Sequence, residues 1–230
     1  MVINVKTLIV AGVVATAGCS SQVARIRTAP GDVVVPGIGE GASATASGVR
    51  VIARAQAWQW EPRNLSTEVT PFLIELRNDG SHPVLVRYNR ISLTDADGHR
   101  FMVMPPYDID GSVTERYTVM NPYYGFSGFA VAPYLSRWYP RFTRYSGVFA
   151  YDPAYYTPYV TQYRNIELPT ADMVQRALPE GVLSPGGSAA GFVYFQALHS
   201  DARTLTLSVE MVDAVNGRSL GHAIIPFVTN

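Results

Sequence analysis

TLTLSVEMVDAVNGRSLGHAIIPFV, residues 204–228, is the stretch of this 230-residue chain that decides its fold. Every second residue from Leu205 to Met211 is apolar and the residues between them are polar, which is the period of a strand with one buried face. Asn216 and Gly217 then separate this run from a second apolar run, and Asn-Gly in that place is a strong hairpin signal. The stretch therefore predicts two antiparallel strands joined by a tight turn.

The same alternation recurs in other runs of the chain. These runs are RVIARAQAWQW (50–60), PFLIELRN (71–78), PVLVRYNRISLTD (83–95), RFMVM (100–104) and SAAGFVYFQAL (188–198). Asp79-Gly80 and Asp97-Gly98 fall between runs and predict two more hairpins. About seven short strands with polar-out, apolar-in alternation predict a mainly β protein, an antiparallel β-sandwich. The one expected helix is short, residues 171–178, with Thr170 as its N-cap.

Two segments of the chain resemble small immunoglobulin-like domains of bacterial surface lipoproteins. They are FLIELRNDGSHPVLVRYNRISLTDADG (72–98) and LSPGGSAAGFVYF (183–195). The resemblance implies a single immunoglobulin-like sandwich over residues 50–230. The cysteine pair that antibody domains place around a buried tryptophan is absent, although Trp58 and Trp60 are present. Only the general sandwich follows from it, because a fold alone does not give a function.

Cys19 is the only cysteine and follows a short apolar segment. Lys6, the run LIVAGVVATA (8–17) and Gly18 have the order of a secretory signal peptide. Small residues followed directly by cysteine resemble the lipobox of bacterial lipoproteins, which implies that residues 1–18 are removed and that Cys19 carries lipid. Thr16 stands where that family prefers an aliphatic residue.

Two other interpretations of the N-terminus stay open. A transmembrane span needs about 20 apolar residues, and the run before Gly18 is roughly half as long. The leader could also be cut elsewhere, which would leave Cys19 without a role. A lone thiol in an exported protein otherwise needs a reason, and acylation supplies one.

Residues 19–49 are expected to be a flexible tether that begins with the lipidated cysteine. The stretch PGIGEGASATASG (36–48) contains almost only Gly, Pro, Ala, Ser and Thr. Such a composition buries too little surface to offset the entropy of ordering. The domain organisation expected is therefore a signal peptide at 1–18, a tether at 19–49 and one sandwich domain at 50–230.

The overall charge and the scattered polar residues exclude several classes of function. Basic and acidic residues number 18 each, so no excess of positive charge points to nucleic acid. The four histidines do not form a metal-ligand pair, and the tetrapeptides Asp95–Gly98 and Asp108–Gly111 lack the remaining acids of a calcium loop and predict turns. No nucleophile stands in a catalytic motif. We expect no enzyme activity, no cofactor and no metal.

Residues 107–163 form a tyrosine-rich insertion that holds 12 of the 14 tyrosines. Within it, YLSRWYPRFTRY (134–145) places arginines among aromatic rings, which stack on guanidinium planes. The candidate binding residues are Tyr134, Arg137, Trp138, Tyr139, Arg141, Arg144 and Tyr145. Two interpretations stay open: the rings pack on the sandwich as a secondary core, or they form an exposed recognition surface.

These observations together predict a lipid-anchored envelope protein that acts as a binding or structural module. Its expected partners are the membrane, through the anchor, and an envelope protein or polysaccharide. In the lipoprotein family a serine after the cysteine goes with transfer to the outer membrane, so the resemblance implies that address through Ser20. Two alternatives remain: an accessory subunit of an envelope secretion or transport complex that docks through the insertion, and a hydrolase of envelope polymers.

Overall fold

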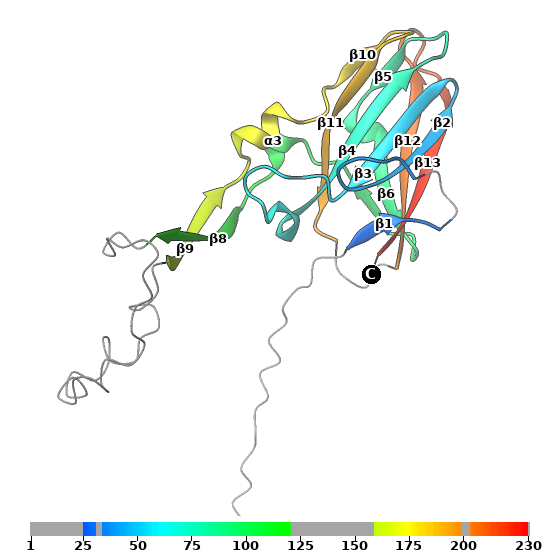
Figure 1. The fold of residues 1–230 in the computed structure, drawn as a ribbon. Helices are drawn as coiled ribbons and strands as arrows, with labels where there is room; N and C mark the ends of the chain where they lie inside the picture. Colours follow the sequence, from blue (N-terminus) through cyan, green and yellow to red (C-terminus); the bar gives the residue numbers. More distant parts are fainter. Residues whose placement is uncertain (1–24, 31–33, 121–158, 199–202, 230) are drawn as a thin grey trace, which may run out of the picture.

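The computed structural model describes residues 25–30, 34–120, 159–198 and 203–229, which form two antiparallel sheets packed face to face and a separate two-stranded ribbon (Figure 1). The first sheet has the order β1 (Ile26–Thr28), β13 (Ser219–Thr229), β12 (Thr204–Asp213), β5 (Val84–Val86) and β10 (Gly181–Leu183), with β6 (Ile91–Asp95) on β12 and β7 (Arg100–Met102) on β6. The second has the order β11 (Ser188–Gln196), β4 (Val69–Asn78), β3 (Val49–Ala55) and β2 (Glu40–Ala46). The expected mainly β, two-sheet architecture is confirmed.

The hairpin predicted from residues 204–228 is present as β12 and β13. Leu207 pairs with Ile225, and Gly217 adopts a φ of 72°, as the turn requires. Every second residue from Leu205 to Met211 is buried, so the alternation marks the core face correctly. The Asp97-Gly98 hairpin is confirmed as well, between β6 and β7.

The main core lies between the two sheets. Phe72 of β4 meets Phe195 of β11 and Phe227 of β13 edge to face, with ring centroids 5.8 and 5.2 Å apart. All three rings are fully buried. Because Phe227 belongs to the opposite sheet, this aromatic cluster joins the two layers directly.

The prediction of a flexible tether is wrong for the part of residues 19–49 that the structure describes, because residues 26–28 and 40–46 are strands β1 and β2. Ser47 and Gly48, with φ of 50° and 79°, form the two-residue turn that pairs β2 with β3. Ala42 is fully buried. Small side chains suit this edge strand because the opposite β3 brings its own residues close, and the ladder hydrogen bonds offset the cost of ordering.

Asp79-Gly80 does not form the predicted hairpin, since β4 and β5 lie in different sheets. The Asp79 amide donates to the Gly48 carbonyl, and the Asn78 side chain donates to the carbonyls of His82 and Leu183. These bonds carry the chain from one layer to the other. The Asp-Gly pair makes the local turn, whereas the hydrogen bonds of the buried Asn78 side chain direct the chain after this turn into the other sheet.

Two further predictions of local structure were too long. The strand expected over 50–60 ends at Ala55, because Gln56 turns the chain with a φ of 57°, and the tryptophans that follow lie outside it. The helix is α3 (Ala171–Gln175), where the Thr170 hydroxyl accepts from the Met173 amide as a cap. Three 3-10 turns complete the described elements: η1 (Leu65–Thr67), η2 (Tyr88–Arg90) and η3 (Pro106–Asp108).

The predicted insertion 107–163 is regular where the structure describes it, because strands enter it from both sides. β8 (Ser112–Met120) and β9 (Tyr159–Glu167) pair over nine residues each and make the ribbon that extends away from the sandwich in Figure 1. Within the described residues, no helix has the length and apolar character needed to cross a membrane.

Candidate functional site

The seven predicted binding residues between Tyr134 and Tyr145 lie outside the described residues, as does Cys19. The structure does describe the two strands that lead to residues 121–158. Met120 pairs with Tyr159 at the end of the ribbon that is farthest from the sandwich (Figure 1). The chain therefore leaves and re-enters the described structure at this tip.

Polar side chains join the two strands of the ribbon. Thr114 donates to Asn165 over 2.7 Å, and Tyr117 donates to Gln162 over 2.8 Å. Tyr163 is 69% exposed. A two-stranded ribbon without a covered face is marginal in water, so its order depends on these cross-strand pairs and on its root.

The root of the ribbon is a second core on the outer face of the β11–β4 sheet. It contains Ala57, Leu65, Val69, Ile109, Val113, Leu168, Met173, Phe192 and Tyr194, with Trp58 and Trp60 packed against it. Phe192 and Tyr194 face this cluster, whereas Val193 and Phe195 face the main core. β11 is thus buried on both faces, and it connects the ribbon rigidly to the sandwich.

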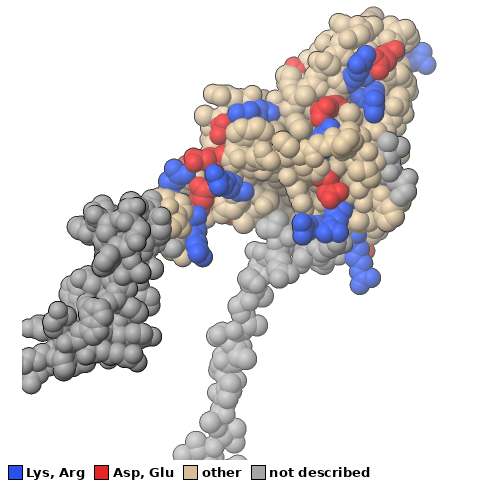
Figure 2. Space-filling view, in the orientation of Figure 1, with Lys and Arg blue, Asp and Glu red and all other residues tan. Residues whose placement is uncertain are grey.

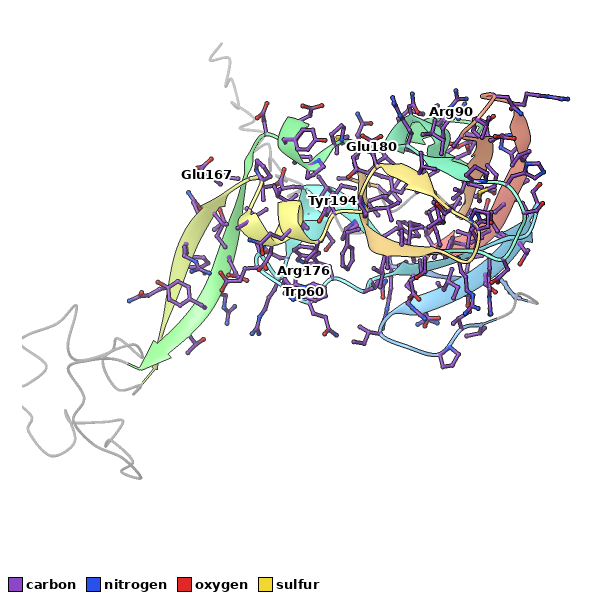
Figure 3. The ribbon with its side chains drawn as sticks, turned by 90° about the horizontal axis from the view of Figure 1, so that it is seen from above. Trp60, Arg90, Glu167, Arg176, Glu180 and Tyr194 are labelled. Atoms are coloured by element: carbon purple, nitrogen blue, oxygen red, sulfur yellow. The ribbon has the colours of Figure 1, made fainter. Side chains whose placement is uncertain are left out.

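An arginine covers the outer side of this cluster. The guanidinium of Arg176, just after α3, lies 4.0 Å from the centroid of the Trp60 ring, and Figure 3 shows the two side chains together beside α3. Trp60 in turn meets Trp58 and Phe192 edge to face. The Arg176 stem and charge therefore shield an aromatic ring that would otherwise face solvent.

An ion network fixes the ribbon at the point where it leaves the sandwich, where acidic and basic groups are interspersed on the surface (Figure 2). Arg164 donates to Glu115 over 3.0 Å and lies 3.1 Å from Glu61, and the Arg63 amide donates to Glu115 over 3.0 Å. The Arg63 amide, together with the Arg164 guanidinium, holds the pKa of Glu115 below its ordinary value. Glu115 is thus an ionised, buried link between β8, β9 and the loop after Trp60.

Residues 176–178 lie along the outer edge of β11 and act as a strap. Phe192 donates to the Arg176 carbonyl over 2.7 Å, and the Leu178 amide donates back to Phe192 over 2.9 Å. Gly191 makes this approach possible, since a Cβ there would lie 2.4 Å from the backbone of Leu178. The strap covers an edge strand that would otherwise be open to pairing.

Two buried tyrosines hold the ends of the α3 segment. Tyr194 donates to the Met173 carbonyl over 2.9 Å, and Tyr88 donates to the Leu178 carbonyl over 2.7 Å. Burial raises the pKa of Tyr88 to about 12 and raises that of Tyr194 as well. Both phenols are therefore hydrogen-bond donors at neutral pH, and neither is poised to act as a base.

A pocket of about 350 Å³ opens where β3 leaves β4. Ala55 is the last β3 residue paired with β4, opposite Phe72, and Gln56 then turns away. Pro71 is opposite Tyr194 in the ladder of β4 with β11. The Tyr194 carbonyl points away from β4, because it accepts from the Met104 amide, so this pair shares no backbone hydrogen bond. The backbone of Pro71 therefore points away from β11, toward the side that β3 has left. Because proline has no amide hydrogen, it leaves no unpaired donor at this gap.

The pocket combines apolar walls with two cations. Its lining consists of Arg25, Ile26, Gln56, Trp58, Arg63, Ser66, Thr70, Pro71 and Leu198. No acidic residue is among them. The apolar surface with a few convergent polar groups is the composition of a small-molecule site.

The Asp95–Gly98 tetrapeptide is a turn, as expected. One Asp95 oxygen accepts from the amides of Asp97 and His99, at 3.0 and 2.8 Å, and the other lies 3.0 Å from the His99 ring. Burial opposes ionisation of Asp95, but the hydrogen bonds from His99 outweigh it and lower its pKa. Asp95, Asp97 and His99 are the one group of possible metal ligands in the described part of the chain, and the turn itself uses the Asp95 oxygens.

Comparison with known proteins gave no match to a protein-family model, to a curated protein or to a solved structure. The site residues that the sequence interpretation missed are Trp58, Trp60, Arg63, Glu115, Arg164 and Arg176. Their signal in the sequence was weak, since two tryptophans at the end of an alternating run look like a continuation of the strand. The ion pair joins residues 115 and 164, and no local pattern connects them.

Proposed function

We propose that this chain is a non-catalytic envelope protein, anchored by lipid on Cys19, which presents the aromatic segment 134–145 to an envelope protein or polysaccharide at the tip of the β8–β9 ribbon. The sandwich, for which we propose an immunoglobulin-like topology, is the rigid base. Ser20 after the cysteine favours an outer-membrane address.

The ribbon is the observation that carries this proposal. The eight steps from Ser112 to Met120, at about 3.4 Å per residue, give the ribbon a length of roughly 27 Å. Polar pairs such as Thr114–Asn165 join its strands, and a second core with the Glu115–Arg164 link fixes its base. Such a construction suits the presentation of the segment between Met120 and Tyr159 at a distance from the sandwich.

The proposed contact chemistry follows from the composition of the segment. Arg137, Arg141 and Arg144 alternate with aromatic rings, and guanidinium planes stack on rings while donating to carboxylates or sugar hydroxyls. Tyrosine adds rigid apolar area with a hydrogen-bonding tip. These groups suit a polar polymer or a protein surface with exposed acids.

The test is retention by isolated envelope material, with detergent-solubilised full-length protein. The double variant Trp138→Ala, Arg141→Ala is expected to lose retention at least tenfold with an unchanged melting temperature. Tyr163→Ala, an exposed ring on the ribbon shaft, is the matched control and retains binding. Retention of the double variant at the wild-type level would refute the proposed surface.

The anchor is tested separately by mass spectrometry of the mature protein beside a Cys19→Ser variant. An acylated Cys19 as the new N-terminus and release of the variant from membranes are expected. An unmodified Cys19 would refute the anchor but would leave the binding surface untouched, so the two parts of the proposal fail independently.

The open edges of the ribbon favour a second candidate, an accessory subunit of an envelope secretion or transport complex. β8 and β9 pair only with each other in the described part of the chain, so each offers an outer edge to which a partner strand can add. Co-purification of a stoichiometric partner, lost when the outward backbone of β8 is interrupted by proline, would favour this candidate over polymer binding.

A further inference from the structure

We propose that the pocket beside Trp58 binds a small organic carboxylate with a flat apolar body. This site lies at the end of the sandwich where β3 separates from β4, and it includes no part of the proposed binding segment. It is therefore a second, independent site.

The apolar wall of the pocket is held in place before any ligand arrives. The Trp58 ring meets Trp60, Phe192 and Tyr194 edge to face, with centroids 5.5, 5.1 and 6.1 Å away. Its Nε1 donates to the Pro62 carbonyl over 2.9 Å. A ring fixed on three sides gives a flat surface for an aromatic ligand at little cost in side-chain entropy.

The charge of the pocket calls for an anion. Arg25 and Arg63 line it, and neither forms an ion pair in the described part of the chain. The Arg63 backbone is fixed because its amide donates to Glu115. A guanidinium on a fixed backbone suits a carboxylate, which it can bind through two parallel hydrogen bonds.

The polar groups of the pocket limit where the carboxylate can lie. The Thr70 hydroxyl is already used, because it donates to the Gln196 carbonyl and accepts from the Leu198 amide, both at 3.2 Å. The side chains of Gln56 and Ser66 have no such fixed role among the described hydrogen bonds. The polar end of a ligand therefore belongs at the arginine side, and the apolar body belongs against Trp58.

The strained backbone of Gln56, in the wall of the pocket, supports a functional origin of the gap between β3 and β4. Gln56 has a φ of 57°, a left-handed conformation that is strained for a residue with a side chain. Without this turn β3 would continue along β4 and close the gap. A volume of about 350 Å³ is at the small end of the range for ligand sites, so the ligand is of the size of two fused rings rather than a polymer.

The experiment is a calorimetric titration of the full chain, kept in solution by an amphipathic polymer, with 2-naphthoate and with its neutral analogue 2-naphthamide. The polymer alone is the blank. We expect naphthoate to bind at least about tenfold more tightly than the amide, since hydrogen bonds to charged groups contribute about 1.5–3 kcal/mol. Equal affinity for acid and amide, or no binding of naphthoate, would overturn the proposal.

Variants locate the binding in the pocket. Arg63→Ala is expected to weaken naphthoate binding about tenfold, and Ser66→Phe to abolish it by filling the cavity. Arg218→Ala, at the β12–β13 turn on the opposite end of the sandwich, is the matched control and binds normally. Arg63 is exposed, so the Arg63→Ala variant is expected to fold. It therefore tests the proposal even if the Ser66→Phe variant does not fold. Competition by inorganic phosphate as strong as that by naphthoate would overturn the requirement for an apolar body.

Discussion

Replacing Gly191 with alanine perturbs the contact that holds the strap of residues 176–178 on β11. A Cβ at this position would lie 2.4 Å from both the Cα and the amide nitrogen of Leu178, and 2.6 Å from the carbonyl carbon of Ala177. These atoms belong to the backbone and cannot rotate away. Restoring an ordinary contact of 3.4 Å requires the strap to move by about 1 Å.

That movement breaks specific interactions, and their sum gives the expected cost. The bonds of Phe192 to Arg176 and Leu178, at 2.7 and 2.9 Å, contribute about 1 kcal/mol each. Displacement of the fully buried Leu178 adds about 1–3 kcal/mol, as in overpacked cores. Gly191 does not have a left-handed φ, so the expected loss of about 3–5 kcal/mol arises from the steric contact.

Urea unfolding followed by far-ultraviolet circular dichroism measures this loss, and hydrogen exchange of the Phe192 and Leu178 amides locates it. Gly98→Ala is the matched control, because Gly98 has a φ of +87° and no atom within 4 Å of the added Cβ. It is expected to cost about 1 kcal/mol, from backbone strain alone. A Gly191→Ala protein within 1 kcal/mol of wild type, with both amides still protected, would refute the reasoning.

Two more substitutions test the root of the ribbon. Tyr194→Phe removes the donor to the buried Met173 carbonyl and is expected to lower the free energy of unfolding by about 1–2 kcal/mol. Tyr163→Phe, on an exposed ring, is the control and changes it by less than about 0.5 kcal/mol. Equal losses for the two variants in urea titrations would contradict this. The folded-state pKa of Glu115 lies below its ordinary 4.5, so its contribution to stability is fully present above about pH 4.5 and is lost as the pH falls through the lower folded value. The stability difference between wild type and Glu115→Gln in thermal melts therefore shrinks between pH 7 and pH 3, and a difference that stays constant over this range would argue against the link.

The sequence pattern predicted those strands that have one face in the core and the other outside it. β12 has a core face and an outer face, so Leu205 to Met211 alternate as a half-buried strand must. The hairpin turns at Gly98 and Gly217 followed from backbone chemistry alone, because both need a positive φ. In these places local and tertiary preferences agree.

Where a segment depends on distant partners, the sequence pattern was misleading. Strand β2 consists mostly of small residues that resemble a linker, and its ladder with β3 and the burial of Ala42 in the main core order it. Trp58 and Trp60 continue an apparent alternation, but the left-handed Gln56 ends the strand before them. The candidate pocket depends on this same turn together with Pro71, which is 15 residues away in sequence, so no local pattern could predict it.

If the chain is anchored through Cys19 as proposed, the short strand β1 has a mechanical consequence. Its three residues pair with the C-terminal end of β13, from Ile26 opposite Thr229 to Thr28 opposite Phe227, and only Ile26 enters the main core. Tension on the chain ahead of Arg25 therefore meets this ladder of three pairs first, and then the bridge of Val34 to Ala42 and the Arg54 bonds to the Val35 and Pro36 carbonyls. Release of β1 alone would free the chain from Ile26 as far as the bridge at Val34, a contour of at most about 30 Å, while the two sheets stay closed around their aromatic cluster. The first strand is thus placed to yield under load and to protect the rest of the fold from it.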